Sequence, residues 1–447
     1  MQLPDDFVAR MSHQLGDEAA AFFMALEQPA PVSVRLNPFK PSGCFENVSP
    51  VPWCRLGRYL RERPSFTLDP TFHAGAYYVQ EASSMFLEKV LESHLDVSNT
   101  ALALDLCAAP GGKSTHLRSL LPDQALLVSN EIIPQRNLVL CDNIIKWGHP
   151  GNVVTRNNPE DFSALSGMFD LILVDAPCSG EGMFRKDEVA VREWSLDNVH
   201  HCAVRQRSIL AVAVEALAPG GLLIYSTCTW SAEEDEEIIA HLTSEYGLEL
   251  LSVPGSEGIV TTKAMARFYP HRVNGEGFFI AALRKPSTNS DAKYGSAKRS
   301  RKEVSHKSTI SPQVYAHILS GDFHYHINKE DIWAIPTVHR NVWELLRQQL
   351  RVVYSGCKVG SIKGKELIPA HAAAMSVCLS SGHEKIVVDQ PTALRYLRGD
   401  AIEISRELSG WLLVQYDQAI LGWGKAVNGR LNNHYPKELR IRMNIER

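Results

Sequence analysis

The chain has 447 residues, of which 45% are hydrophobic and 21% charged, and its formal net charge is -4. This length is too great for one hydrophobic core and predicts several domains, and the net charge excludes a polycation that binds nucleic acid over its whole surface. The sequence has no unbroken apolar stretch of about 20 residues and no targeting segment at its N-terminus, which favours a cytoplasmic protein that does not enter a membrane.

Composition divides the chain into five regions. Residues 1–75 are short segments broken by proline and predict an N-terminal cap. Between 76 and 285, strand-like and helix-like runs alternate, which is typical of an α/β fold with a mostly parallel sheet. Residues 286–311 predict a basic linker, either a solvated tether or an arm that contacts phosphates. Residues 312–385, the middle module, and 386–447, the terminal module, predict small α+β or β-rich units.

The region 76–285 contains the strongest periodic signals. Its predicted strands span 101–106, 125–130, 152–155, 170–175, 221–227 and 277–283, and its predicted helices span 82–93, 112–121, 134–147, 197–217 and 231–243. Open α/β sheets carry their sites outside the carboxyl ends of the strands, so we expect chemistry in the loops that follow them.

The first such loop is ALALDLCAAPGGKSTHL, residues 101–117. It is not a P-loop, because that motif requires glycine where this chain has Cys107, and G-x-G-x-x-G fails as well. The loop instead offers Asp105 at the end of a strand and close approach of a ligand to the backbone at Gly111 and Gly112.

Glu131 follows the second strand, where such folds place a carboxylate on a ribose diol. The alternative is a charge near the N-terminus of the helix that begins at Pro134. Strand, spacing and loop together favour the ribose. Arg136 is expected to steady the carboxylate rather than to contact substrate.

Two further loops each carry a cysteine: DAPCSGEGMFRKD contains Cys178 and IYSTCTW contains Cys228. A free cysteine usually packs as a small hydrophobic residue, but the flanking Pro, Gly, Ser and Thr indicate a turn at a pocket. The nine cysteines are widely spaced and lack a C-x-x-C pair, so neither a disulfide framework nor a zinc site is indicated.

These motifs resemble the RNA 5-methylcytosine methyltransferases of the Sun type, and within them the RsmF-like group. The resemblance spans nearly the whole chain and implies a Rossmann-like class I methyltransferase domain, S-adenosylmethionine as methyl donor, RNA as partner and no metal. Its further motifs are VSVRLNP (32–38), GAYYVQEASSM (75–85), SNEIIPQRN (129–137), FYPHRVNGEGFFIAAL (268–283) and the terminal LGWGK and NHYPK.

The resemblance also implies residue roles. Carbon 5 of cytosine becomes nucleophilic when a thiolate adds to carbon 6; Cys228 resembles that nucleophile, and Cys178 resembles the second cysteine, needed for product release. Lys113 belongs to the site, and Asp175 either protonates the base or orients the donor. The residues expected to bind the donor are Cys107, Ala108, Ala109, Pro110, Gly111, Gly112, Lys113, Glu131, Arg136, Asn158 and Asp175. For the adenine, Asn157, Asn158 and Asp161 remain alternatives.

The terminal sequence GWGKAVNGRLNNHYPKELRIRMNIER interleaves cations with Trp423, His434 and Tyr435, as a surface that stacks bases and contacts phosphates requires. We therefore expect a PUA-like RNA-binding module there and a contribution of the cap to RNA binding. Residues 312–447 hold no candidate catalytic group, so truncation near residue 285 is expected to leave donor binding intact while weakening RNA binding and its salt dependence.

Two other segments are explained by local structure alone, a helix start and a hairpin turn. SAEEDEEII predicts a helix capped by Ser231 with acids in its first turn, and Gly275 and Gly277 predict a hairpin turn that leaves His271 and Arg272 as weak candidates.

Three functions stay open: an RNA cytosine methyltransferase, a DNA cytosine methyltransferase, and a non-catalytic RNA-binding ribosome-assembly factor. The resemblance favours the first, as a monomer acting on small-subunit (16S) ribosomal RNA or the assembled subunit, over transfer RNA.

Overall fold

The computed structural model describes residues 3–40, 43–45, 47–287, 311, 315–364 and 366–444. The predicted basic linker 286–311 lies almost entirely outside the described residues. Among the described residues no helix is long and apolar enough to cross a membrane.

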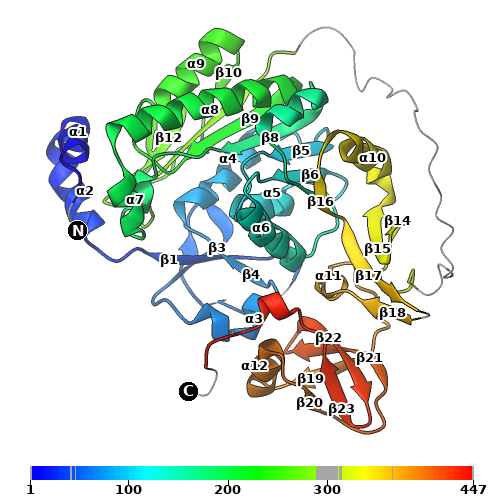
Figure 1. Cartoon of the computed structure of the whole chain (residues 1–447). Helices are drawn as coiled ribbons and strands as arrows, with labels where there is room; N and C mark the ends of the chain where they lie inside the picture. Colours follow the sequence, from blue (N-terminus) through cyan, green and yellow to red (C-terminus); the bar gives the residue numbers. More distant parts are fainter. Residues whose placement is uncertain are drawn as a thin grey trace.

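A ten-stranded sheet forms the centre of the molecule, in the order β11-β12-β13-β9-β8-β5-β6-β7-β16, with β10 beside β13 (Figure 1). Strands β5 to β9 run parallel, and β13 is antiparallel to β9. The strands are β5 Leu102–Asp105, β6 Leu126–Asn130, β7 Asn152–Thr155, β8 Phe169–Asp175, β9 Leu217–Thr227, β10 Glu249–Leu251, β11 Val260–Thr262, β12 Met265–Phe268, β13 Phe278–Arg284 and β16 Val352–Ser355.

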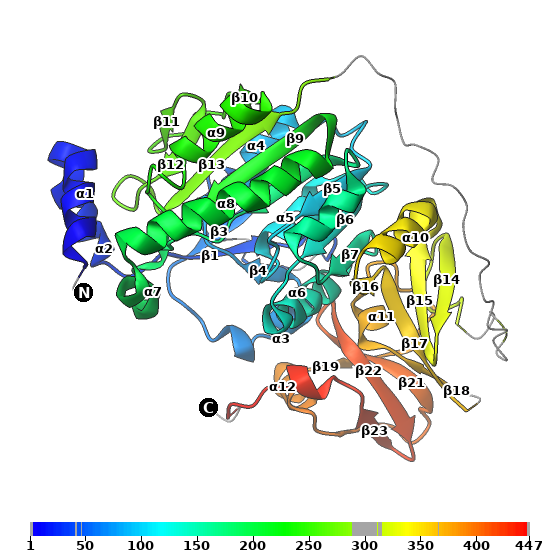
Figure 2. The same cartoon turned by 45° about the horizontal axis from the view of Figure 1, so that its top comes forward.

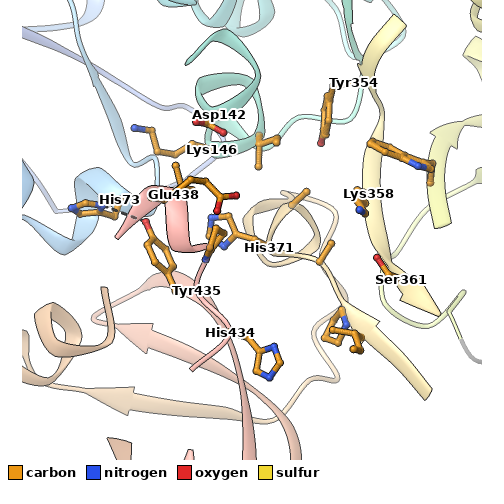
Figure 3. Close-up of a pocket in the computed structure, with 18 of the residues that line it drawn as sticks. His73, Asp142, Lys146, Tyr354, Lys358, Ser361, His371, His434, Tyr435 and Glu438 are labelled. Carbon is orange, nitrogen blue, oxygen red and sulfur yellow. Dashed lines mark hydrogen bonds between the residues drawn. The ribbon is translucent and has the colours of Figure 1, made fainter. Parts of the chain in front are cut away.

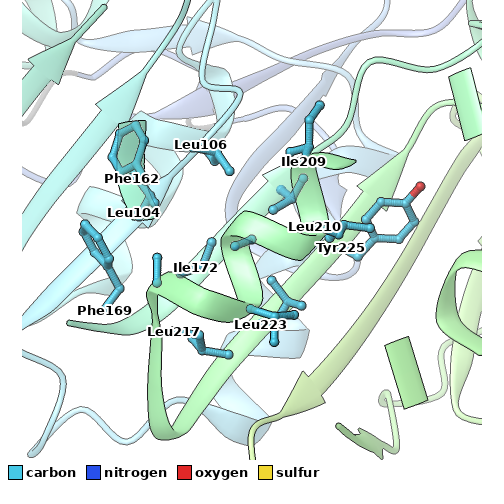
Figure 4. Close-up of a cluster of buried hydrophobic side chains, with 14 of the residues drawn as sticks. Leu104, Leu106, Phe162, Phe169, Ile172, Ile209, Leu210, Leu217, Leu223 and Tyr225 are labelled. Carbon is cyan, nitrogen blue, oxygen red and sulfur yellow. The ribbon is translucent and has the colours of Figure 1, made fainter. Parts of the chain in front are cut away.

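Helices cover both faces of this sheet. They are α4 Leu87–His94, α5 Gly112–Leu120, α6 Pro134–Trp147, α7 Glu188–Glu193, α8 Leu196–Ala216 and α9 Glu236–Tyr246. Figure 4 shows Leu210 of α8 packed over Ile172 and Leu223 of neighbouring strands, all fully buried. The predicted α/β core is confirmed, because near-continuous apolar strands such as β8 are stable only when both faces are covered.

The N-terminal cap has two helices, α1 Asp5–Leu15 and α2 Ala19–Leu26, followed by an antiparallel sheet and a short helix, α3 Pro70–His73. The sheet contains β1 Val32–Leu36, β2 Pro50–Val51, β3 Cys54–Leu60 and β4 Tyr77–Val79. Arg35 of β1 is buried and donates to Thr115 Oγ1 at 2.7 Å and to the carbonyl of Gly112 at 3.2 Å. The cap is thereby fastened to the helix that follows the glycine loop.

The middle module contains β14 Phe323–Asn328, β15 Asp331–Pro336, α10 Arg340–Gln349, β17 Cys357–Lys363, β18 Glu366–Pro369 and α11 His371–Met375. The terminal module contains β19 Lys385–Val388, α12 Gln390–Arg398, β20 Ile402–Glu403, β21 Gly410–Tyr416, β22 Ala419–Val427 and β23 Arg430–Asn433. Strands β21 and β22 pair antiparallel, as the sequence predicts.

The middle module is not independent of the central sheet. Its strand β16 pairs antiparallel with β7, and Figure 2 shows it at that edge beneath α10. Trp343 and Leu346 of α10 join the same apolar cluster as Phe162 and Leu165, which lie in the segment after β7. The sheet edge is therefore completed by a strand about 200 residues further along the chain, which the sequence did not predict.

Candidate active site

The two cysteine loops meet at the carboxyl ends of β8 and β9. These strands are adjacent and parallel, with Asp175 opposite Ser226, so Cys178 and Cys228 leave the sheet side by side. Their sulfur atoms lie 3.2 Å apart, and the backbone N–H of Cys228 donates to Cys178 Sγ at 3.4 Å. The contact with the Cys228 side chain, together with burial, raises the pKa of Cys178 well above its usual value, and the backbone N–H of Cys228 only partly opposes this. Cys178 therefore stays a thiol beside its neighbour.

An ion pair lies next to the cysteines. Lys113 Nζ is 2.8 Å from Asp175 Oδ2, and Ser226 Oγ donates to Asp175 Oδ1 at 2.8 Å. Burial alone would lower the pKa of Lys113, but the charge of Asp175 outweighs it and the pKa is raised. Lys113 thus has the anionic partner that a cation at a helix N-terminus needs. Both oxygens of Asp175 accept, which suits orientation of cations better than donation of a proton to a base.

The glycine loop brings the main chain close to helix α6 and strand β4. A side chain at Gly111, whose φ is +110°, would come within 3.2 Å of Leu140 Cδ1, and one at Gly112 within 3.3 Å of Tyr78. Arg136 donates to the carbonyl of Ala109 at 2.8 Å, and the N–H of Ala108 donates to Asn130 at 2.8 Å. The loop is thus held by backbone contacts.

Two further loop residues have distinct surroundings. Pro110 is exposed, and its carbonyl accepts from Asn143 at 2.8 Å. Burial raises the pKa of Cys107 far above its usual range, so this third cysteine is no nucleophile.

Asp105 lies directly under the loop. It is fully buried, Ser114 Oγ donates to its Oδ2 at 2.6 Å, and its Oδ1 has no partner among the described residues. Burial raises the pKa of this carboxyl to about 7. A buried oxygen without a partner is costly, so Asp105 is suited to a ligand that brings a donor or a positive charge.

Glu131 follows β6 with its side chain buried. Its Oε1 accepts from the N–H of Ile133 at 2.8 Å, and Arg136 Nη1 is 3.3 Å from its Oε2. Glu131 therefore accepts a hydrogen bond at the start of α6, as one interpretation of the sequence predicts. Its carboxylate also retains lone pairs for a ribose hydroxyl, as the other interpretation requires.

The residues considered for the adenine are already hydrogen-bonded. Asn157 Nδ2 donates to Asp161 Oδ2 at 2.8 Å, and Asn157 Oδ1 accepts from the N–H of Arg351 at 2.9 Å. The Asn158 side chain accepts from the N–H of Asp161 and caps the short helix that follows. These hydrogen bonds fix the segment after β7, and the one from Arg351 ties it to the middle module.

Buried carboxylates behind the cysteine loops were missed by sequence reasoning. Glu181 is fully buried; its Oε1 accepts from Arg10 at 2.6 Å, and its Oε2 accepts from the N–H of Trp230 at 2.9 Å. Glu234 is also fully buried, and its Oε2 accepts from the N–H of Ser179 at 3.0 Å. Because Trp230 and Ser179 flank the two cysteines, these carboxylates fix both loops. The only sequence signal was their position beside the motifs.

The expected cap at Ser231 is wrong. Helix α9 begins at Glu236, and two of the acids before it, Glu234 and Asp235, are buried. Asp235 accepts from Thr227 Oγ1 at 2.6 Å and from Arg267 at 2.7 Å. Asp235 therefore supports the end of β9 just before Cys228, because its charge is paired inside the protein.

Other candidates lie away from the cysteines. His271 and Arg272 both contact Glu18 and hold the N-terminal helices in place. Trp423 is 1% exposed and donates to the carbonyl of Ala370 at 3.0 Å, and Tyr435 is 3% exposed. The expectation of an exposed stacking surface is therefore wrong for these two aromatics, because they pack inside the terminal module and at its contact with the middle one.

One cluster of metal-ligand residue types occurs among the described residues: Cys54, Glu88 and His116, all buried. Cys54 Sγ and His116 Nε2 lie 3.0 and 3.2 Å from Glu88 Oε2. Hydrogen bonds account for this arrangement, which joins β3 of the cap to α4 and α5.

The chain matches three family descriptions: 16S rRNA methyltransferase RsmB/F over residues 92–284, the N-terminal domain of 16S rRNA methyltransferase RsmF over 3–82, and the methyltransferase RsmF PUA domain over 384–441. It is 33% identical to ribosomal RNA small subunit methyltransferase F of Vibrio vulnificus over 446 residues, covering 94% of this chain and 93% of the relative. The protein of that name from Aliivibrio fischeri is 31% identical, with 98% and 97% covered.

Solved structures show the same fold. A methyltransferase homolog protein from Pyrococcus horikoshii superposes with a TM-score of 0.55 at 29% identity, over 63% of this chain and 95% of that one. NSun6 from the same organism shares the fold with a TM-score of 0.54 at 23% identity, over 64% and 99%.

Proposed function

The chain belongs to the family of ribosomal RNA small subunit methyltransferase F, and from that premise we propose that it transfers a methyl group from S-adenosylmethionine to carbon 5 of a cytosine in 16S ribosomal RNA. The observation that carries this proposal is the 3.2 Å approach of Cys178 and Cys228 beside the glycine loop. Two cysteines that meet at the carboxyl ends of neighbouring strands suit a reaction that forms and then breaks a covalent bond to the base.

The residues of the glycine loop fit the methyl donor. S-adenosylmethionine, when bound, supplies an electrophilic methyl group on a positively charged sulfur. The backbone of residues 107–112 would hold its methionine end, Glu131 its ribose, and the unpartnered oxygen of Asp105 offers negative charge to it. Asp175, which pairs with Lys113, is the third acidic side chain assigned to the donor, after Asp105 and Glu131.

Cys228 begins the reaction by adding its sulfur to carbon 6 of the cytosine, which makes carbon 5 nucleophilic. The Lys113 ammonium interacts electrostatically with Cys228 and so places a positive charge near the reacting sulfur. Lys113 also lies 5.1 Å from the ring centre of Phe278, which restricts where the ammonium points. Lys113 is therefore the cation assigned to the charge that develops on the substrate.

Cys178 acts after methyl transfer. The proton on carbon 5 must pass to solvent, the electron pair of that C–H bond reforms the double bond between carbons 5 and 6, and the bond to carbon 6 breaks so that Cys228 departs as a thiolate. Cys178 Sγ lies 3.2 Å from that departing sulfur. We assign it to this release step, with Glu181 and Glu234 positioning the two loops.

The test is transfer of tritium from labelled donor by the purified full chain. We expect label in 16S ribosomal RNA, as the free RNA or in the small subunit, and none in transfer RNA or DNA. Bisulfite sequencing of ribosomal RNA from cells lacking the gene then identifies the cytosine. Label in transfer RNA alone would overturn the substrate assignment, and no label in any nucleic acid would overturn the activity. We place this reaction in the cytoplasm and assign it to a monomer.

A further inference from the structure

A cavity of about 570 Å³ lies apart from the cysteine loops, where three parts of the chain meet. One side comes from α3 and α6, another from β15, β16 and β17 of the middle module, and the third from α11 and the segment after β23 (Figure 3). Neither cysteine of the active site lines it. We call it the three-part pocket. Its volume is in the range of sites that hold small organic groups.

Two sides of the pocket each pair an aromatic ring with a cation. Lys146 Nζ of α6 lies 4.1 Å from the ring centre of Phe72. On the middle module, Lys358 Nζ lies 5.9 Å from the ring centre of Trp333, which itself contacts Tyr354 edge-on at 5.5 Å. Rings interleaved with cations are what proteins use to hold unstacked bases beside their phosphates.

The third side adds an imidazole and a phenol. The rings of His371 and Tyr435 meet edge-on with centres 5.2 Å apart, and Figure 3 shows both at the centre of the pocket. His371 Nδ1 is buried and has no hydrogen-bond partner among the described residues. A buried nitrogen without a hydrogen-bond partner destabilises the free protein. A ligand that donates a hydrogen bond to this nitrogen would remove that cost.

The charges in the pocket are also incompletely paired. Within the described part of the chain, the Lys146 ammonium makes no hydrogen bond or ion pair, whereas Lys358 pairs with Asp331 at 2.8 Å. Burial lowers the pKa of Lys146 to about 8, so it remains mostly charged at neutral pH. Asp142 and Glu438 line the pocket as well and offer acceptors for the amino groups of a base.

We propose that the three-part pocket binds one unpaired nucleotide of the RNA substrate, with its base among Trp333, Tyr354 and Tyr435 and its phosphate at Lys146. The proposal rests on the proposed function, because RNA is then the molecule that must cross this face of the protein. It also gives His434 and Tyr435 of the terminal sequence a role, as lining of a pocket rather than as an exposed surface.

The test uses the full chain and a 16S ribosomal RNA fragment carrying 4-thiouridine at its unpaired positions. Light-induced adducts mapped by mass spectrometry should fall on peptides containing Trp333, Tyr354 or Tyr435. In Lys146→Gln, the affinity for unlabelled RNA should fall about tenfold, as loss of a charged hydrogen bond predicts. Lys363→Gln, an exposed lysine of β17 outside the pocket, is the matched control and should change it less than twofold.

Donor affinity and thermal unfolding are measured for both variants, so that a misfolded protein is recognised. If Lys146→Gln is misfolded, Lys358→Gln replaces it, and its RNA affinity is again expected to fall about tenfold. Wild type that methylates RNA but forms no adduct on these peptides, with Lys146→Gln equal to Lys363→Gln, overturns the pocket and leaves the activity standing. Nucleoside monophosphates that bind the pocket and are not displaced by RNA would assign it to a free nucleotide and also overturn the proposal. Failure of wild type to methylate any RNA concerns the proposed function instead.

Discussion

The side-chain oxygen of Asn157 accepts a hydrogen bond from the backbone N–H of Arg351 at 2.9 Å. The contact joins the segment after β7 to the residue that precedes β16, the strand that extends the sheet beyond β7. The middle module thus completes the side of the catalytic domain to which we assign the methyl donor. This relationship changes what truncation of the chain should do.

A chain ending near residue 285 should not bind the donor normally, contrary to the expectation from sequence. It would expose the edge of β7 and the apolar surface that α10 covers. A point variant tests the same contact: Trp343→Ala should lower the free energy of unfolding by about 3–5 kcal/mol, as for other buried aromatics. Val338→Ala, at a residue 68% exposed, should change it by less than about 0.5 kcal/mol. Equal effects in a denaturant titration would show that α10 is not part of the core.

Variants of the two cysteines should show different catalytic defects. Cys228→Ala should neither methylate RNA nor form a covalent complex, because the first bond to the base is never made. Cys178→Ala should accumulate a protein–RNA adduct that survives a denaturing gel, because release is blocked. Cys202→Ala, at a buried cysteine of α8 outside the site, serves as the control with normal turnover. An adduct in Cys228→Ala and none in Cys178→Ala would reverse the assigned roles.

Glu131→Ala should weaken binding of S-adenosylmethionine tenfold or more in calorimetry, since a charged hydrogen bond to the ribose contributes about 1.5–3 kcal/mol. Glu160→Ala, an exposed acid near the same strand edge, should leave the affinity unchanged. If both variants bind like wild type, Glu131 serves only the helix start at Ile133.

Donor binding should depend on pH through Asp105. Burial raises the pKa of this carboxyl to about 7 in the free protein, and a positively charged donor favours the ionised form. Affinity should therefore be full above pH 7 and fall as the pH drops below 7, by up to about tenfold per pH unit, with proton release on binding near neutrality. Asp105→Asn should bind more weakly and lose this dependence. A wild-type affinity that is flat between pH 5.5 and 8 would remove Asp105 from the donor site.

Glu181 should act as a positioning residue. Glu181→Gln leaves Arg10 without its charge partner and places a donor where Trp230 N–H already donates. We expect stability to fall by about 1–3 kcal/mol and covalent adduct formation to slow in a Cys178→Ala background, with donor affinity retained. Glu188→Gln, at an exposed acid nearby, is the control. Loss of stability with an unchanged rate of adduct formation would limit Glu181 to a structural role.

The sequence predicted most of the catalytic domain because its signals are local. Strands such as β6 and β8 are continuous apolar runs, and α6 spans Pro134–Trp147 as expected. The convergence of Cys178 and Cys228 also follows from sequence, because parallel neighbouring strands end at one edge.

What was missed depends on long-range contacts. Strand β16 has only four residues and its partner β7 lies far back in the chain, so no local pattern reveals the pairing. The sequence does not single out Glu181, it predicts Glu234 only as an acid in the first turn of a helix, and it predicts Trp423 on a stacking surface, whereas all three side chains are buried. Only the packing of distant segments shows that these side chains are buried.

Strand β16 has a consequence for how the chain is made. At about 5–20 residues per second, β7 leaves the ribosome some 10–40 seconds before the strand that will cover its edge. During that interval the nascent catalytic domain carries an open hydrogen-bonding edge and an uncovered apolar face. The edge of β7 therefore gains its partner strand only after residue 355 has been synthesised, so the central sheet is completed late in translation.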